Sequence, residues 1–356
     1  MNRVRKPYMW LLGQDDNLGD IVLRRRLLQH VVGDGRPAVY FGSSSQDYIR
    51  ATTHGHDVEI FDSSSKWYFS LLLSAVRGRA HLYFPPGEVR EIKSVGVWNL
   101  LMLPVLILVR ATGGKVHNLG SGLYSEETIW IVPIRMLSRL AEKVVVRDSQ
   151  TQRRLGHGNV MPDLAFDEYG IESGRGPEQA PRDVLALSFR GKNFHLNESA
   201  RIALKEVALQ LRLQLIVVVQ VRSDHAAMEQ FASEIGANFL GWSSDTSAVE
   251  QEKKVRQVYS EAVIVMSDRI HSLIIGATEG ALPIGFMQHA DDKVGRHLEA
   301  AGLEDMSLDA TSLSTDQIRG FVNCVLERSE SSSIAIAQAA RAVTEYAPIP
   351  SQLEDC

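Results

Sequence analysis

Short apolar runs of strand length alternate along the chain with longer segments of helical periodicity. In the first half, these patterns predict strands at 8–13, 38–41, 58–61, 81–84, 115–119 and 143–146, and helices at 20–32, 67–76 and 128–140. Strands that alternate with helices of this length usually pair in parallel. The first half therefore predicts an open α/β sheet.

The same alternation starts again in the second half. Here the patterns predict strands at 184–189, 215–221, 238–240, 262–266 and 282–286, and helices at 198–211, 224–235, 249–262, 270–280, 293–301, 315–327 and 333–346. The segment 167–183 between the halves is rich in Gly, Pro, Glu and Arg and has no periodicity, which favours a linker. We expect two doubly wound, Rossmann-like α/β domains that face a cleft.

A length of 356 residues is too great for one ordinary core and fits two domains. We place the first domain at 1–170 and the second at 183–330. A C-terminal helix and tail, 331–356, is expected to pack back on the first domain.

The most informative motif is Ser267-Asp-Arg-Ile-His271, which follows the apolar strand at 262–266. Arg269 and His271 then fall in the first turn of the next helix, at the carboxyl end of a strand, where open α/β sheets bind ligands. The helix N-terminus favours an anion there. A guanidinium and an imidazole suit a phosphate or carboxylate together with proton transfer. The alternative is that Arg269 caps a neighbouring helix and His271 packs in the core.

Other cations follow predicted strands. Arg147 opens a helix after the strand at 143–146, Arg190 follows the strand at 184–189, and Lys293 follows the strand at 282–286. Each of these cations lies just beyond the carboxyl end of a predicted strand, where open α/β sheets bind ligands, and the two domains are expected to face one cleft. Together with Arg269 and His271 they indicate a small, highly anionic ligand.

Several loops offer weaker candidates for the acceptor side of a site. Asn17 and Asp20 lie in a turn between the first strand and the first helix, where Asp20 is a reasonable N-cap. Glu88 and Ser121 lie in glycine-containing loops after strands, and Asp163 follows another strand. Each is as well explained by a turn or a cap as by a ligand.

Composition narrows the class of protein. A formal net charge of −5 argues against a nucleic-acid partner. The two cysteines, Cys324 and Cys356, have no metal-ligand spacing and suggest a reducing compartment. We expect no metal and no cofactor.

The longest apolar run, 95–109, contains Asn99 and Pro104 and is shorter than the about 20 residues of a membrane-spanning helix. It predicts a buried or interfacial helix. With no recognisable secretory signal, we expect a cytoplasmic protein, with peripheral contact at the inner face of the membrane left open. The oligomeric state is not determined by these patterns.

On these residues the chain resembles the polysaccharide pyruvyl transferase family. The matching pieces are Asn17-Leu-Gly-Asp20, Val146-Arg-Asp-Ser149, Asp163-Leu-Ala-Phe166, Ser267-Asp-Arg-Ile-His271, Gly280-Ala-Leu-Pro283 and Lys293. The resemblance implies a glycosyltransferase-B-like fold. It also implies transfer of pyruvate from phosphoenolpyruvate to two hydroxyls of a sugar or lipid-linked oligosaccharide acceptor, as a cyclic ketal. The chain departs from the family at Pro85-Pro-Gly-Glu88, where a glycine-rich loop is common.

The resemblance assigns Arg147, Arg269, His271 and Lys293 to the donor, and we add Arg190 and Ile270 as further candidates near it. His271 and Arg269 are the expected catalytic residues. Two alternatives stay open: a nucleotide-sugar glycosyltransferase of the same architecture, and a relative that binds an anion without catalysis.

Overall fold

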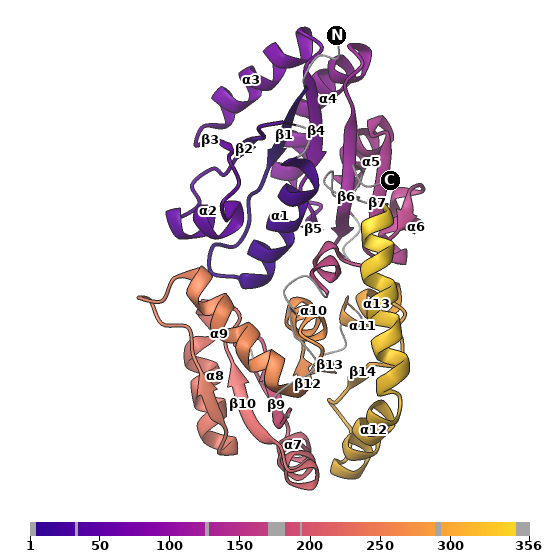
Figure 1. Ribbon diagram of the computed structural model, residues 1–356. Coiled ribbons are helices and arrows are strands. Elements are labelled where there is room, and N and C mark those ends of the chain that lie inside the picture. Colours follow the sequence, from indigo (N-terminus) through magenta and orange to yellow (C-terminus); the bar gives the residue numbers. More distant parts are fainter. Residues whose placement is uncertain are drawn as a thin grey trace. The chain divides into compact units, whose positions relative to one another are not determined.

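The computed structural model describes residues 5–32, 35–124, 128–169, 182–192, 194–288 and 293–346. The chain divides into two compact units. The first comprises Met1–Asp15, Asp20–Leu164 and Ala342–Cys356, and the second comprises Asp16–Gly19 and Ala165–Arg341. Each unit has its own parallel sheet, so the expectation of two separate α/β sheets is confirmed (Figure 1). Most of the expected linker, 170–181, lies outside the described residues.

The first sheet has the strand order β3-β2-β1-β4-β6-β7-β8, with β5 paired to β6, and every pair is parallel. The order reverses between β1 and β4, which makes their carboxyl ends the ligand position of a doubly wound sheet. The strands are β1 (Lys6–Trp10), β2 (Ala38–Tyr40), β3 (Glu59–Phe61), β4 (Ala80–Phe84), β5 (Gly87–Val89), β6 (Val116–Leu123), β7 (Lys143–Val146) and β8 (Asn159–Val160).

Strand β6 is longer than the sequence predicts. It runs through Ser121 to Leu123 because a register shift at Gly120, whose φ is +82°, lets the chain rejoin β7. Glu88 likewise lies in the short strand β5 and not in a loop. Ser121 and Glu88, both expected in loops, therefore lie in paired strands.

The helices that pack on the first sheet are α1 (Leu18–Val31), α2 (Gln46–Thr53), α3 (Ser64–Val76), α4 (Lys93–Ala111), α5 (Ile131–Leu140) and α6 (Ser149–Leu155). Helices α3, α4 and α5 share one core with alternate residues of β1 and β4. In this core Tyr8 and Trp10 contact the fully buried Trp67 of α3 edge-on. These three helices therefore cover the same face of the sheet.

Helix α4 is long and apolar enough to cross a membrane by length and composition, and about a third of its most apolar window is buried (33%). Its inner side chains, such as Leu106 and Val109, lie in the core against the sheet. Its outer side chains Leu101 and Ile107 are more than half exposed. It is thus a sheet-covering helix whose outer side is also apolar.

The second sheet has the order β11-β10-β9-β12-β13-β14, again with all pairs parallel, and the order reverses between β9 and β12. Its strands are β9 (Val184–Ser188), β10 (Gln214–Val218), β11 (Asn238–Leu240), β12 (Ala262–Ser267), β13 (Leu282–Met287) and β14 (Ser307–Asp309). The sequence did not indicate β14, because three residues are too few to show a period.

Helices of the second unit alternate with these strands. They are η2 (Leu164–Glu168), α7 (Glu198–Leu211), η3 (Arg222–Asp224), α8 (His225–Ile235), α9 (Ala248–Glu261), α10 (Ile270–Thr278), α11 (Lys293–Ala300), α12 (Thr315–Glu327) and α13 (Ser329–Tyr346). Helix α13 begins in the second unit, and its residues from Ala342 onward group with the first.

Adjacent residues of α4 provide a test of this packing. Leu106 is fully buried and Ile107 is 55% exposed. Leu106→Ala should lower the free energy of unfolding of the first unit by about 2–5 kcal/mol, because it leaves a core cavity. Ile107→Ala should change it by less than about 0.5 kcal/mol. Urea unfolding followed by tryptophan fluorescence in a Trp242→Phe background reports this unit, since the other four tryptophans belong to it. Equal effects of the two substitutions would contradict the assignment of the inner face.

Candidate functional site

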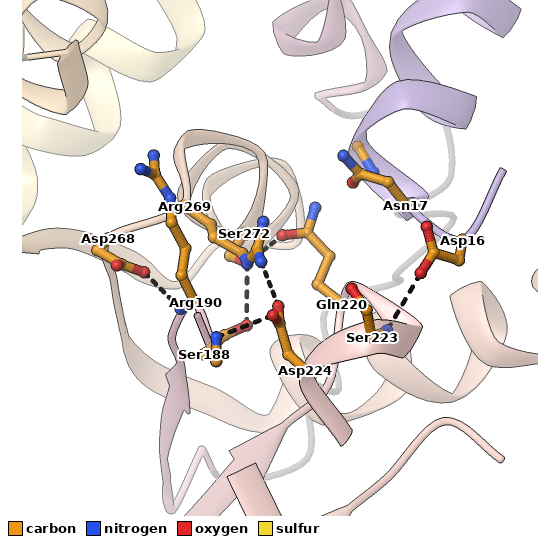
Figure 2. Close-up of polar contacts among 12 residues, drawn as sticks. Asp16, Asn17, Ser188, Arg190, Gln220, Ser223, Asp224, Asp268, Arg269 and Ser272 are labelled. Atoms are coloured by element: carbon orange, nitrogen blue, oxygen red, sulfur yellow. Dashed lines mark hydrogen bonds and ion pairs between the residues drawn. The ribbon is translucent and has the colours of Figure 1, made fainter. Parts of the chain in front are cut away.

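Polar side chains converge where β9, β10 and β12 end, at the reversal of strand order in the second sheet. Arg190 follows β9, Gln220 and Asp224 follow β10, and Asp268 and Arg269 follow β12 (Figure 2). The fold thus places cations and carboxylates from three neighbouring strands at the position where doubly wound sheets bind ligands.

Arg269 is the N-cap residue of α10, one position before the first turn in which the sequence placed it. Its guanidinium donates to Asp224 Oδ2 and forms an ion pair with that carboxylate. Asp224 Oδ1 accepts from the backbone N–H of Gly191 at 2.8 Å. The carboxylate therefore fixes the direction of the Arg269 side chain, which keeps 18% of its surface exposed.

Charges of both signs are concentrated here. Asp268 Oδ1 accepts from the backbone N–H of Arg190 at 2.9 Å. Burial raises the pKa of the Asp268 carboxyl, against the opposing effect of the Arg190 charge. Burial also lowers the pKa of Arg269, while Asp224 and Asp268 act to raise it. Two partly desolvated guanidiniums, Arg190 and Arg269, thus share a small polar region.

A hydroxyl and amide layer lies beneath these charges. Ser267 Oγ donates to the carbonyl of Ser188 and accepts from the Arg269 backbone N–H at 2.9 Å. Ser272 lies 3.1 Å from Ser188 Oγ and also donates to Gln220 Oε1. In this part of the described chain, Gln220 Nε2 is buried with no hydrogen-bond partner. These hydrogen bonds link the ends of β9, β10 and β12.

The segment Asp16–Gly19 joins the second unit although it lies near the N-terminus. Asn17 forms an antiparallel bridge with Val221, and the backbone N–H of Leu18 donates to the Gln220 carbonyl at 3.2 Å. The Ser223 N–H donates to Asp16 Oδ2 at 3.1 Å. The structure therefore places Asn17 beside the strand end of the second unit that carries Gln220, whereas the sequence had suggested Asn17 as a candidate for the acceptor side.

His271, the second residue of α10, packs against Gly19. A Cβ atom on Gly19 would lie 2.4 Å from His271 Nδ1, closer than any real contact. Only glycine at this position lets the imidazole lie directly against the backbone of this segment. Two of the motifs on which the family resemblance rests, Asn17-Leu-Gly-Asp20 and Ser267-Asp-Arg-Ile-His271, thus meet in space.

The remaining donor candidates divide between the units. Ile270 is the first residue of α10, and Lys293 is the first residue of α11, which follows β13, the neighbour of β12. Arg147 belongs to the first unit. Its convergence with Arg269 on one donor stays a prediction.

Within the first unit, Arg147 lies among the weaker candidates. Its guanidinium is 3.8 Å from Glu88 and 3.7 Å from Asp163, and its backbone N–H donates to the Ser121 carbonyl at 3.2 Å. Arg147 is only 3% exposed, and a Cβ on Gly122 would lie 2.4 Å from its Nε. The structure therefore brings together four residues that the sequence treated separately.

Asp20 lies within the first turn of α1, because this helix begins at Leu18. It is therefore not the N-cap that the sequence suggested. Its carboxylate accepts from the Gln14 backbone N–H at 2.8 Å and pairs with Arg24 at 3.1 Å. These contacts close the loop after β1.

A cavity of about 400 Å³ opens in the first unit at the carboxyl ends of β1, β4 and β6. Its lining includes the aromatic side chains of Trp10, Tyr40, Phe84 and Trp98 and the polar side chains of Asn99, Asn118 and Ser121. Asn118 is 7% exposed, and its Oδ1 has no hydrogen-bond partner among the described residues. The cavity coincides with the reversal of strand order in the first sheet and is a second candidate ligand position.

Sequence reasoning did not identify Asp224, Gln220 or Ser272 as site residues. Gln220 lies near the end of the apolar run predicted as a strand at 215–221 and Asp224 shortly after it, which is the signal that could have found them. Among the described residues, no group of three or more His, Cys, Asp or Glu side chains is arranged to hold a metal ion.

Comparison with solved structures identifies the fold. The chain is similar to UDP-GlcNAc 2-epimerase from Neisseria meningitidis, with 9% sequence identity, coverage of 96% of this chain and 99% of that chain, and a TM-score of 0.57. It is also similar to a glycosyltransferase from Rickettsia africae, with 10% identity, coverage of 100% and 97%, and a TM-score of 0.55. These similarities confirm the glycosyltransferase-B-like architecture.

Comparison with curated proteins finds no match. The sequence model of the polysaccharide pyruvyl transferase family, by contrast, matches residues 17–286. This range begins at Asn17, beside the site, and includes every strand end that forms it. The chain therefore belongs to the polysaccharide pyruvyl transferase family.

Proposed function

We propose that this protein transfers pyruvate from phosphoenolpyruvate to two hydroxyls of a sugar in a cell-surface polysaccharide or its precursor, in the cytoplasm and without a cofactor. The observation that carries the proposal is the pair Arg190 and Arg269 at the reversal of strand order in the second sheet. Phosphoenolpyruvate carries a carboxylate and a phosphate on three carbons, and guanidiniums bind both groups through paired N–H donors.

The chemistry requires one proton donor and a site for the departing phosphate. Protonation of C3 of the enol gives a methyl group and an oxocarbenium-like C2. One sugar hydroxyl attacks C2, the C2–O bond to phosphate breaks, and the second hydroxyl closes the ketal. The two sugar hydroxyls lose two protons in total. One of them replaces the proton that the acid gave to C3, and the other leaves with phosphate.

We assign the acid role to His271 and the donor-binding role to Arg269. The two side chains lie two positions apart at the start of α10, so they point in different directions around its axis. The arginine can hold the anion while the imidazole addresses the reacting carbon or the leaving oxygen. Arg147 and Lys293 are proposed as further donor ligands on the family resemblance.

For the acceptor, we propose the cavity of the first unit. The aromatic side chains in its lining suit the apolar face of a sugar ring, and the amide oxygen of Asn118 can accept a hydrogen bond from a sugar hydroxyl. The competing donor class is a nucleotide sugar, since the Neisseria meningitidis epimerase was solved with UDP-GlcNAc bound.

A thermal-shift comparison separates these donors. Phosphoenolpyruvate at 100 times its dissociation constant should stabilise the protein by about 2.7 kcal/mol, and UDP-GlcNAc should not.

Arg269→Lys should weaken phosphoenolpyruvate binding about 10–1,000-fold, because it keeps the charge and loses the paired donors. His271→Gln should retain binding and lower kcat by about 10²–10⁴-fold. Near-normal turnover of His271→Gln at saturating phosphoenolpyruvate would rule out the acid role.

Gly19→Ala tests the position of the imidazole. Alanine favours a helix over glycine by about 1 kcal/mol, yet its Cβ would displace His271. We expect kcat to fall by at least about tenfold while the affinity for phosphoenolpyruvate changes little. Gly320→Ala in α12 is the matched control, because nothing lies near its added Cβ, and it should only stabilise the protein slightly. If both variants had normal turnover, the contact between Gly19 and His271 would not matter for catalysis.

Asn118→Leu tests the acceptor cavity. Because the substitution removes a buried, unpartnered amide oxygen, it should not reduce stability. It should raise KM for the acceptor about 10-fold or more and leave the phosphoenolpyruvate thermal shift unchanged. An unchanged KM for the acceptor would move the acceptor site elsewhere.

A further inference from the structure

Three neighbouring helices of the first unit expose large apolar side chains. Helices α3, α4 and α5 share the core on one face of the first sheet, so their opposite sides face outward together. Ten apolar residues on these helices and the turn before α5 are at least 41% exposed. We call them the outer face: Phe69, Leu73, Val76, Val97, Leu100, Leu101, Ile107, Ile129, Val132 and Met136.

The outer face is continuous. Tyr68 Oη of α3 donates to the Leu101 carbonyl of α4 at 3.1 Å, which ties these two helices together. The Trp130 ring, just before α5, packs so closely on α4 that a Cβ on Gly96 would lie 2.3 Å from it. These contacts link α3 to α4, and α4 to the turn before α5. Contiguous apolar surfaces of this kind mark a site of contact with a protein or a membrane.

The charge on these helices has only one sign. Together α3, α4 and α5 contain no Asp or Glu, although the whole chain has a net charge of −5. Arg110 pairs at 2.7 Å with Glu142, which lies outside the helices, and Lys66, Lys93 and Arg139 are exposed. The basic residues of the three helices are Lys66, Lys93, Arg110, Arg135 and Arg139.

The exposed apolar side chains and the basic residues of these helices together favour one binding partner for the outer face. A two-fold contact between two copies of the chain would bring the outer face against itself and oppose basic residues with basic residues. An anionic lipid surface matches both properties, since the apolar side chains enter the acyl boundary and the cations contact the head groups. Because the inner side of α4 is held in the core, α4 would lie in the plane of the bilayer and not span it.

We propose that the outer face docks on the surface of an anionic lipid bilayer. The cavity of the first unit is lined by Ser94, Val95 and Trp98 of α4 and by Ile134 and Leu137 of α5, two of the helices that carry the outer face. If the proposed function holds, the acceptor is therefore a lipid-linked saccharide presented at the membrane. The docking itself does not depend on that function.

Vesicle co-sedimentation of the full-length protein tests the docking. The protein should bind vesicles of phosphatidylcholine with 30% phosphatidylglycerol (a composition of roughly physiological charge) and bind pure phosphatidylcholine far more weakly. Leu101→Glu/Ile107→Glu should reduce binding by at least about tenfold. Lys66→Gln/Lys93→Gln/Arg139→Gln should reduce it about a hundredfold on anionic vesicles. Phe69→Ser, on a different helix, is a second apolar variant in case the double variant does not fold.

The matched control is Leu209→Glu, which changes an 81% exposed leucine of α7 in the second unit. It should bind vesicles like the wild type. Failure of the wild type to bind anionic vesicles, or an equal loss in the control, would overturn the proposal. So would a wild-type dimer in sedimentation that becomes a monomer on Leu101→Glu/Ile107→Glu, together with no vesicle binding, since the outer face would then contact a second copy.

Two further readouts separate this proposal from the proposed function. The phosphoenolpyruvate thermal shift should be the same in Leu101→Glu/Ile107→Glu and in the wild type, since neither residue is among those proposed to bind the donor. Turnover of a lipid-linked acceptor in vesicles should fall in that variant, and turnover of a water-soluble glycoside should not. Vesicle binding without a phosphoenolpyruvate shift would leave the docking intact and refute the donor.

Discussion

The ion pair between Arg269 and Asp224 holds the candidate site in one arrangement. Its two residues follow β12 and β10, the strands on either side of β9, and Asp224 also accepts from the Gly191 backbone after β9. A buried guanidinium without a carboxylate would lose its hydration with nothing in return. Asp224 offsets that cost while part of Arg269 stays exposed for a ligand. The direction of the guanidinium therefore depends on three strand ends at once.

The first unit also holds an arginine side chain with carboxylates from other segments. Arg147 is buried between Glu88 and Asp163, and the absence of a side chain at Gly122 makes room for it. In both units a cation that follows a strand is held by carboxylates from other segments. The difference lies in exposure, because Arg269 keeps 18% of its side chain exposed and Arg147 only 4%. Arg269 is therefore better placed for direct contact with an anion.

The two faces of α4 illustrate how one sequence pattern can serve two purposes. A helix that is apolar all round is normally buried or membrane-spanning. Here Leu106 packs in the core, while Leu101 and Ile107 form part of the outer face, on a helix that contains Lys93 and Arg110 and no acidic residue. If the proposed function holds, such a surface would bring the protein to a lipid-linked acceptor, which does not leave the membrane.

Sequence periodicity by itself determined the fold class, because the hydrophobic period of a strand or a helix of this length is visible within its own residues. It also placed Arg269 and His271 near the start of a helix after a strand, since that step needs only residues 262–280. The partners of these residues were decided by tertiary structure alone. Asp224 lies 45 positions from Arg269 and Gly19 lies 252 positions from His271, and no local pattern encodes contacts over such distances. Similarly, the apolar run at 95–109 predicted a buried or interfacial helix, but only packing against the sheet decided which of its side chains face the core and which face outward.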